Sequence, residues 1–244
     1  MIKFITPNWP APSQVKAYTT TRHGGYSQSP YDGFNLADHV GDDAKAVAAN
    51  RALLRETLNL PAEPIWLKQV HSHQIIKANA ENSHYTADAS FSTTSGQVCV
   101  VMTADCLPVF FCDQSGTRVA VAHAGWRGLA NGILEISLQQ LDLPAKEILA
   151  WLGPAIGPQV FEVGPEVRQA FIEFLPQAEE AFKQTREGHW LADLYCLARQ
   201  RLAHQGVTAI YGGDFCTYTE ERFYSYRRDK VTGRMASLIW LEGC

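Results

Sequence analysis

Five-residue runs rich in apolar side chains recur along the middle of the chain and predict buried strands. They occupy residues 98–102, 108–112, 118–122 and 148–152. A strand with one solvent-exposed face alternates apolar and polar residues, whereas a strand covered on both faces has a continuous run of apolar residues. The pattern therefore predicts strands in the interior of a sheet. Looser patterns predict further strands over residues 14–21, 64–70, 75–77, 207–211, 223–227 and 234–241, the last two joined by a turn.

Apolar residues at helical spacing separate these strands. Val47, Leu54 and Leu58 repeat on one face of residues 44–58, and Asp42 or Asp43 can cap that helix. Further helices are predicted over 129–141, from Pro165 onward, and over 191–202. Strands outnumber helices and do not alternate with them regularly, which favours an α+β fold with mixed sheets flanked by helices. Because no linker or repeat interrupts the pattern, residues 1–244 are expected to form a single domain.

The composition is that of an ordinary globular protein with a slight acidic excess. Its 244 residues carry a formal net charge of -4, which argues against nucleic acid as a partner because sequence-independent binding needs a basic face. The apolar runs are far shorter than the roughly 20 residues of a membrane helix, so no membrane contact is expected. The first residues lack the apolar stretch of a signal peptide, and six cysteines are too few for a disulfide scaffold. We therefore expect reduced thiols and a cytoplasmic location.

Three predicted strands end at, or just before, a side chain that can bind a metal or act as a nucleophile. These side chains are His71, Cys106 and His123. If the strands are neighbours, two imidazoles and one thiolate converge. Two histidines and one cysteine make a three-ligand set for zinc, with an open fourth position where water can bind and be activated.

The same residues allow a metal-free alternative. Cys106 would be the nucleophile, His123 or His71 its base, and Asp105 an orienting group. The metal content of the protein after chelator treatment separates the two alternatives. Cys99 and Cys112 lie inside apolar runs, and we expect them to be core residues.

The number of histidines limits the identity and the number of metal ions. A set of four coppers, each with two to three imidazoles, would need about ten histidines. The chain has eight, and His71 and His73 form its one His-x-His pair. One metal ion is therefore the most that this sequence supports comfortably. A mixed nitrogen and sulfur site suits zinc and also tolerates copper.

Arginines beside glycine-rich or aromatic turns are the candidates for binding an anion. Arg127 lies between Gly125 and Gly128 just before a predicted helix, where a helix N-terminus and a guanidinium favour phosphate. Arg22 precedes two glycines, and Arg227 and Arg228 end an aromatic segment. The sequence contains neither a Walker A motif nor a Rossmann glycine fingerprint.

Taken together, these segments closely resemble the YfiH family, also called the laccase-domain or polyphenol-oxidase-like family. The resemblance rests on Trp-Leu-Lys-Gln-Val-His at 66–71, Thr-Ala-Asp-Cys-Leu-Pro at 103–108, His-Ala-Gly-Trp-Arg-Gly at 123–128 and Trp-Leu-Gly-Pro-Ala-Ile-Gly at 151–157. It continues through 19–25, 35–36 and 225–229. It therefore covers essentially the whole chain.

The resemblance implies a fold, a metal site and an activity. The fold is one α+β domain similar to the catalytic domain of the cytotoxic necrotizing factor, a toxin deamidase that uses Cys and His. The metal site is a zinc held by His71, Cys106 and His123. The activity is phosphorolysis of adenosine, inosine, guanosine and methylthioadenosine, accompanied by deamination of adenosine. Older naming as a copper laccase and a role in removing misplaced serine from a muropeptide precursor are the alternatives that the family leaves open.

The same resemblance leads us to expect particular roles for residues around the metal. Cys106, His123 and Asp105 are the expected catalytic residues, with Asp105 as the nearest acid or base. Arg127, Arg228 and Asn35 are expected to contact the substrate, a purine nucleoside with phosphate. We expect a monomer or a weak oligomer.

Overall fold

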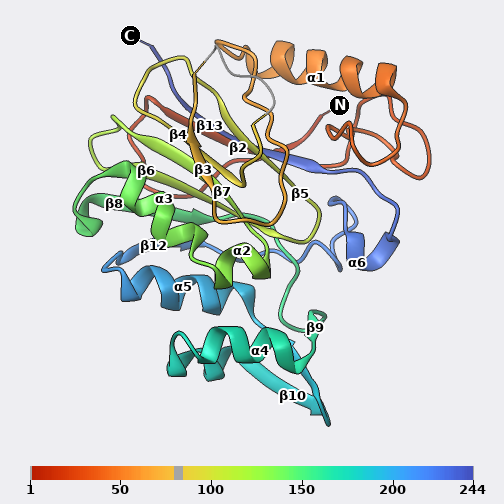
Figure 1. The fold of residues 1–244 in the computed structure, drawn as a ribbon. Coiled ribbons are helices and arrows are strands. Elements are labelled where there is room, and N and C mark those ends of the chain that lie inside the picture. Colours follow the sequence, from red (N-terminus) through yellow and green to blue (C-terminus); the bar gives the residue numbers. More distant parts are fainter. Residues whose placement is uncertain (1, 80–84, 244) are drawn as a thin grey trace.

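Two β-sheets packed face to face form the centre of the computed structural model, which describes residues 2–79 and 85–243 (Figure 1). The larger sheet has the strand order β12-β8-β6-β7-β4-β3. Strand β6 pairs antiparallel with both neighbours, while β12 pairs parallel with β8 and β3 parallel with β4. The fold is therefore α+β with mixed sheets, as the sequence predicts. The six strands are Ile75–Lys77 (β3), Ala89–Ser92 (β4), Leu107–Asp113 (β6), Val119–Ala124 (β7), Ile148–Leu152 (β8) and Ala209–Gly212 (β12).

The second sheet is antiparallel and places a late strand in its middle. Its order is β1-β2-β13-β5, so that β13 pairs with β2 on one side and β5 on the other. The strands are Phe4–Ile5 (β1), Val15–Thr20 (β2), Cys99–Thr103 (β5) and Met235–Leu241 (β13). Its inner face packs on the larger sheet through a shared apolar cluster that includes Val101, Phe110, Val121, Trp151 and Ile239.

Helices cover the two outer faces, so that the main body has four layers (Figure 1). Helix α1 (Ala44–Leu58) packs Leu54 against Val100 and Leu238 of the smaller sheet. Helices α2 (Trp126–Ala130), α3 (Ile133–Leu141) and α5 (Leu194–His204) cover the larger sheet. As the sequence predicts, the carboxylate of Asp43 caps α1, because it accepts hydrogen bonds from the backbone N–H groups of Lys45 and Ala46.

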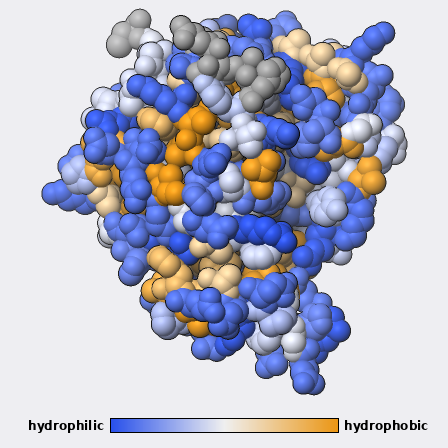
Figure 2. Space-filling model, viewed as in Figure 1, coloured by the Kyte–Doolittle hydropathy of each residue, from blue (hydrophilic) through white to orange (hydrophobic). Residues whose placement is uncertain are grey.

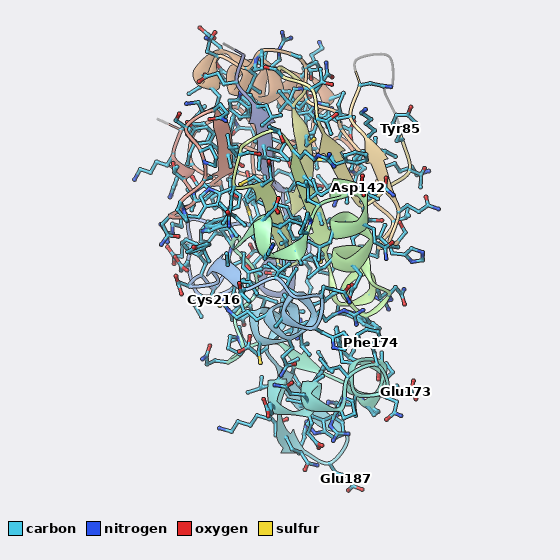
Figure 3. The ribbon with its side chains drawn as sticks, turned by 90° about the vertical axis from the view of Figure 1, so that its left-hand side faces the viewer. Tyr85, Asp142, Glu173, Phe174, Glu187 and Cys216 are labelled. Carbon is cyan, nitrogen blue, oxygen red and sulfur yellow. The ribbon has the colours of Figure 1, made fainter. Side chains whose placement is uncertain are left out.

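A small projection extends from the main body and carries Glu173, Phe174 and Glu187 (Figure 3). It contains α4 (Pro165–Ile172), a 3₁₀ helix at Pro176–Ala181, and the three strands Glu162–Val163 (β9), Phe182–Arg186 (β10) and His189–Ala192 (β11). Phe171 and Phe182 pack with ring centroids 6.2 Å apart. Phe161 and Val163 join the apolar cluster beneath the larger sheet, which ties the projection to the body.

Two segments predicted as strands are not strands. Residues 64–70 run alongside both sheets but make only isolated bridges, from Ile65 to Cys99 and from Lys68 to Thr86. Residues 223–227 lead instead into the short helix α6 (Tyr226–Asp229), because the Ser225 hydroxyl accepts from the backbone N–H of Arg228. The predicted hairpin of 223–227 with 234–241 is therefore absent, and β13 pairs with β2 and β5.

The predicted helix 129–141 starts earlier and is broken. Asn131 ends α2, and Gly132 with a φ of 91° lets the chain turn before α3 begins. A residue with a side chain adopts such a φ only with strain, whereas glycine does so readily. Helix α2 begins two residues after β7 ends and three residues after His123.

The outer surface in the view of Figure 2 is mostly hydrophilic, with its apolar patches interrupted by polar side chains. Over the part of the chain that the structure describes, no helix combines the length and the apolar character needed to cross a bilayer.

Candidate metal centre

His71, Cys106 and His123 meet at one end of the larger sheet. Their donor atoms all lie within 4.8 Å of one another, and Cys106 Sγ is 3.9 Å from His71 Nε2. The two imidazole rings stand edge to face, with centroids 4.8 Å apart. Among residues 2–79 and 85–243, this is the one group of three or more His, Cys, Asp or Glu side chains so arranged.

Strand pairing holds Cys106 and His123 together. Cys106 directly precedes β6, and His123 lies in β7 opposite Pro108 of β6. His71 reaches the cluster differently from the prediction, because it lies in a loop rather than at a strand end and has a φ of 60°. The three side chains differ in burial: His123 is buried, Cys106 partly buried and His71 exposed.

Asp88, just before β4, organises two of the three donors at once. Its carboxylate accepts hydrogen bonds from the backbone N–H groups of Val70, His71 and Ser72, at 3.2, 2.9 and 2.7 Å. These bonds fix the loop that carries His71 in its left-handed conformation. The same carboxylate lies 2.9 Å from Nδ1 of His123. A carboxylate only accepts, so Nδ1 carries the proton and Nε2 of His123 is left to face the cluster.

The charges within the cluster support one another. Burial alone would raise the pKa of Asp88, but hydrogen bonds from His123 and Ser72 outweigh it and lower that pKa to about 2. Burial would also raise the pKa of Cys106, yet the two imidazoles outweigh it and lower that pKa to about 6. In contrast, burial raises the pKa of both Cys99 and Cys112 to about 12. Cys106 is thus set apart from the core cysteines as a thiolate.

Gly125 leaves room for a group between the three donors. A Cβ on Gly125 would stand 3.0 Å from Cys106 Sγ, 3.0 Å from His71 Cδ2 and 3.6 Å from His123 Nε2. Zinc bonds of 2.0–2.3 Å in tetrahedral geometry separate such donors by about 3.4–3.6 Å. The observed spacing of 3.9 Å between Cys106 and His71 closes to that value with small side-chain movements. The donor set and its spacing therefore fit a single zinc ion.

One cavity borders the cluster, and a second cavity adjoins the first. The first, of about 340 Å³, is lined by His39, Gln69, His71, Met102, Ala104, Cys106, His123, Tyr226 and Arg234. The second, of about 550 Å³, shares His39, Gln69 and Met102 with the first and extends along Trp66 and Arg51. Cavities of this size suit small-molecule substrates. Two hydrogen bonds hold Gln69 and Met102 together where the cavities meet. The Gln69 amide nitrogen donates to the Met102 carbonyl at 2.8 Å, and the Met102 backbone N–H donates to the Gln69 amide oxygen at 2.7 Å.

Asp105 adjoins the cluster along the chain, but its carboxylate is already hydrogen-bonded. Its Oδ1 accepts from the Thr217 hydroxyl at 2.7 Å, and its Oδ2 accepts from the Arg227 backbone N–H at 2.6 Å. Asp105 has a φ of 90° and does not line the cavity beside the cluster. The carboxylate thus ties two distant loops to the segment that carries Cys106.

The residues expected to contact substrate are not gathered at the cavity. Arg127 is exposed, with its guanidinium carbon 4.3 Å from the Trp126 ring centroid. Arg228 donates from all three guanidinium nitrogens, to the carbonyls of residues 217, 218 and 223 and to Asp229. Asn35 is fully buried, and its side chain contacts Ala37, Asp42 and the backbone N–H of Arg234.

Sequence reasoning did not single out Asp88 or Arg234. Asp88 stands alone between two alanines, before a strand of small and polar residues that no apolar run marks. Arg234 falls at the start of a predicted strand, where a solvated arginine is the usual outcome. The sequence offers one signal for each residue. Asp88 is an isolated carboxylate 35 positions before His123, and Arg234 directly follows a glycine.

Comparisons with known proteins identify the family of this chain. The family model described as multi-copper polyphenol oxidoreductase laccase matches residues 16–242. The chain belongs to this family. It is 56% identical over 243 residues to purine nucleoside phosphorylase YfiH of Escherichia coli, a match that covers 99% of this chain and 100% of that protein. It is 53% identical over 244 residues to a purine nucleoside phosphorylase of Pseudomonas aeruginosa, with 99% and 100% coverage.

Solved structures of this family share the fold. The Neisseria meningitidis protein NMB0706 superposes with a TM-score of 0.94 at 50% identity, covering 98% of this chain and 99% of that one. YlmD of Geobacillus stearothermophilus also reaches a TM-score of 0.94, at 31% identity, covering 98% and 96%. The expected resemblance to the YfiH family is therefore confirmed.

Proposed function

We propose that this protein is a zinc-dependent purine nucleoside phosphorylase acting on adenosine, inosine, guanosine and methylthioadenosine, with accompanying deamination of adenosine. The observation that carries the proposal is a His-Cys-His cluster, with no fourth protein donor among the described residues, that faces a substrate-sized cavity. A structural zinc site would have four protein ligands, whereas a catalytic one keeps a position open. Relatives at 53% and 56% identity bear the name purine nucleoside phosphorylase.

The residues of the cluster have separate roles in holding the ion. Cys106 supplies a thiolate, and His71 and His123 supply neutral imidazole nitrogens, with Asp88 orienting His123. When bound, zinc supplies a Lewis acid that polarises an oxygen or activates a water molecule. Copper is the alternative ion for this donor set.

Phosphorolysis replaces the bond between C1′ and N9 of the nucleoside. A phosphate oxygen forms a new bond to C1′, the C1′–N9 bond breaks, and its electron pair leaves with the purine, which takes up a proton. The ribose passes through a positively charged, oxocarbenium-like state, which the negative charge of the attacking phosphate stabilises. Deamination instead adds water at C6 of adenine and releases ammonia. Asp105 supports both by fixing the loops at Thr217 and Arg227 rather than by exchanging protons.

One observation favours a second candidate, a cysteine hydrolase. The Cys106 thiol lies within 4.8 Å of a ring nitrogen of His123, and His123 contacts Asp88, which is the order of nucleophile, base and orienting carboxylate. Release of serine from a muropeptide precursor belongs to this class. A copper oxidase has less support, because the described residues contain one such cluster and not the several that four coppers need.

Metal content and product analysis test the proposal together. Elemental analysis is expected to find about one zinc per chain, lost in the double variant Cys106→Ala and His123→Ala. Chelation should abolish, and zinc restore, phosphate-dependent release of purine from adenosine. Cys196→Ala, which removes a thiol outside the cluster, should keep both metal and turnover.

The cysteine hydrolase predicts a different set of results. Alkylation of Cys106 would abolish turnover of the serine-containing precursor while chelation left it intact. Four coppers per chain, or full zinc retention in the double variant, would contradict the proposed site.

We propose further that the enzyme works in the cytoplasm on small molecules, without nucleic acid or membrane, as a monomer or weak oligomer. All five cysteines in the described residues are free thiols, which suits a reducing compartment. Size-exclusion chromatography with light scattering measures the oligomeric state.

A further inference from the structure

A single permanent cation faces the cavity beside the metal cluster. Of the nine side chains that line this cavity, Arg234 is the only arginine or lysine. It lies just before β13, and its guanidinium carbon is 5.9 Å from the centroid of the Tyr226 ring on the cavity wall. A guanidinium stays charged at any pH at which proteins are folded. The cavity therefore combines a thiolate, the three imidazoles of His39, His71 and His123, and one fixed positive charge.

The guanidinium of Arg234 is anchored at one end and open at the other. Its Nη1 donates to the carbonyls of Thr232 and Gly233, at 2.8 and 3.0 Å, which uses both of its protons. Within the described residues, Nε and Nη2 have no acceptor, and neither is among the atoms closed off from solvent. The Nε–Nη2 edge carries two parallel N–H bonds, the arrangement that binds an oxyanion in bidentate fashion.

Buried Asn35 fixes the backbone of this arginine. The Asn35 Oδ1 accepts from the backbone N–H of Arg234 at 2.9 Å, and its amide nitrogen is held by Asp42 and the Ala37 carbonyl. Asn35 is therefore a positioning residue that acts through Arg234 and is closed to the substrate. Holding the arginine in advance reduces the entropy lost when an anion binds.

The other arginines near the cluster lack this combination. Arg228 has an acceptor for each guanidinium nitrogen, and Arg127 is exposed and absent from the cavity wall. Arg227 donates to the Glu162 carbonyl and packs on Phe161. We propose that Arg234 binds the anionic co-substrate, a phosphate oxyanion, through its Nε–Nη2 edge inside the cluster cavity. The proposal rests on the proposed function for the identity of the anion as phosphate.

Phosphorolysis requires a group that binds phosphate next to the ribose, and the Arg234 guanidinium could serve as that group. The phosphate that attacks C1′ must leave water for the cavity, and an ion that loses its hydration needs a charged partner there. A bidentate guanidinium provides that partner and directs one phosphate oxygen toward the ribose. Arg234 and Cys106 line the same cavity, so an anion held by the guanidinium lies beside the cluster.

Titration with inorganic phosphate tests the proposal without requiring turnover. Isothermal titration of zinc-loaded protein with phosphate should show one site, weakened about ten- to hundredfold in Arg234→Ala, the worth of a charge-assisted bidentate contact. Arg234→Lys keeps the positive charge but lacks the two parallel N–H donors, so its phosphate affinity should lie between those of the wild type and Arg234→Ala. Lys230→Ala, which removes a nearby cation outside the cavity wall, should match the wild type. Zinc content should be equal in all four.

Kinetics separate a binding role from a merely structural one. In Arg234→Ala the KM for phosphate should rise at least about tenfold, while the KM for the nucleoside stays within about threefold. If Arg234→Ala does not fold, Arg234→Gln, which keeps the side-chain length, is compared in the same way. Unchanged phosphate affinity in the folded variants, no phosphate binding by the wild type, or a selective loss in Arg127→Ala would overturn the assignment. Phosphate binding through Arg234 without any phosphorolysis would support it while rejecting the proposed function.

Discussion

Two buried aspartates, Asp88 and Asp113, each hold a tight loop in place, at opposite ends of the larger sheet. Each is almost fully buried, and each accepts hydrogen bonds from consecutive backbone N–H groups of a tight loop. Asp88 holds the loop at residues 70–72, while Asp113 holds the loop at 115–118 between β6 and β7. In both, hydrogen bonds to the carboxylate lower its pKa against the effect of burial.

The difference lies in what else each carboxylate touches. Within the described residues, the Asp113 carboxylate accepts hydrogen bonds only from its own hairpin loop, from Ser115, Thr117 and Arg118. Asp88 also contacts His123, 35 positions away, and holds the loop that carries His71. The same arrangement therefore closes a turn in the first case and, in the second, assembles a His-Cys-His cluster that could hold a metal ion. One additional contact, with the ring of His123, therefore distinguishes the carboxylate that organises the cluster from the one that only closes a loop.

Asp88→Asn should have the largest effect on the site. The amide nitrogen of asparagine cannot accept from the N–H groups that Asp88 holds, and the charge opposite His123 is lost. We expect zinc affinity to fall about ten- to hundredfold, the usual cost of removing a partner that orients a metal ligand. Competition with a chelator of known affinity measures it. Asp113→Asn is the matched control, and equal zinc affinities in the two variants would contradict the comparison.

Gly125→Ala should disturb the cluster without disturbing the fold. The new Cβ would press on Cys106 Sγ and His71 Cδ2, each at 3.0 Å. We expect zinc affinity to fall about tenfold, less than in Asp88→Asn, with an unfolding temperature within a few degrees of the wild type. Gly164→Ala, whose Cβ meets only the movable end of Glu166, should leave zinc affinity unchanged. An undiminished affinity in Gly125→Ala would show that the donors have more room than their spacing indicates.

Asp113→Asn should lower stability and leave zinc binding intact. Losing several hydrogen bonds to a charged acceptor is expected to cost about 1.5–3 kcal/mol at neutral pH. Because the folded pKa of Asp113 is lowered, its contribution is fully present above the unfolded value of about 3.9 and is lost as the pH falls through the folded pKa. Urea unfolding from pH 7 to pH 3 should show the gap between variant and wild type narrowing in acid. A gap that is constant over this range would contradict the assignment.

Ser72→Ala should have the smallest effect. Its hydroxyl donates one of the several hydrogen bonds to Asp88, at 2.7 Å, and the backbone N–H of Ser72 remains as a second donor. We expect a loss of about 0.5–1.5 kcal/mol in stability and a change in zinc affinity of less than about threefold. Thermal unfolding and chelator competition measure the two quantities. A loss of affinity as large as that of Asp88→Asn would mean that the hydroxyl, not the backbone, holds the loop.

Much of the sheet structure was predictable because buried strands carry their own pattern. The apolar runs at 98–102, 108–112, 118–122 and 148–152 correspond to β5, β6, β7 and β8. Strand β4 was not predicted, since its sequence Ala-Ser-Phe-Ser is small and polar although every residue is buried. Its burial comes from neighbouring strands that the local sequence does not reveal. The aromatic segment 223–227 gave the opposite error, a predicted strand that is absent. Phe223 and Tyr224 are buried, but they lie in a loop.

The three candidate metal ligands were predictable because each lies just after a segment that the sequence predicts as a strand. The carboxylate that positions two of them was not predictable. Asp88 acts through backbone groups of residues 70–72 and the ring of His123, and those contacts exist only after folding. Asn35 was expected at the substrate because it lies in a segment that resembles the family. Its buried amide instead holds the backbone of Arg234, a contact that spans 199 positions.

The central position of β13 has a consequence for the order in which the protein matures on the ribosome. Strands β2 and β5 are synthesised long before the strand that fits between them, and the hydroxyls of Thr19 and Ser237, 2.8 Å apart, are separated by 218 positions. Until β13 has been translated, both strands leave an unpaired edge facing the same gap in the nascent chain. Arg234 precedes β13 directly, so the cavity gains its fixed positive charge in the same late step. A partly synthesised chain therefore holds His71, Cys106 and His123 while the cavity beside them still lacks Arg234.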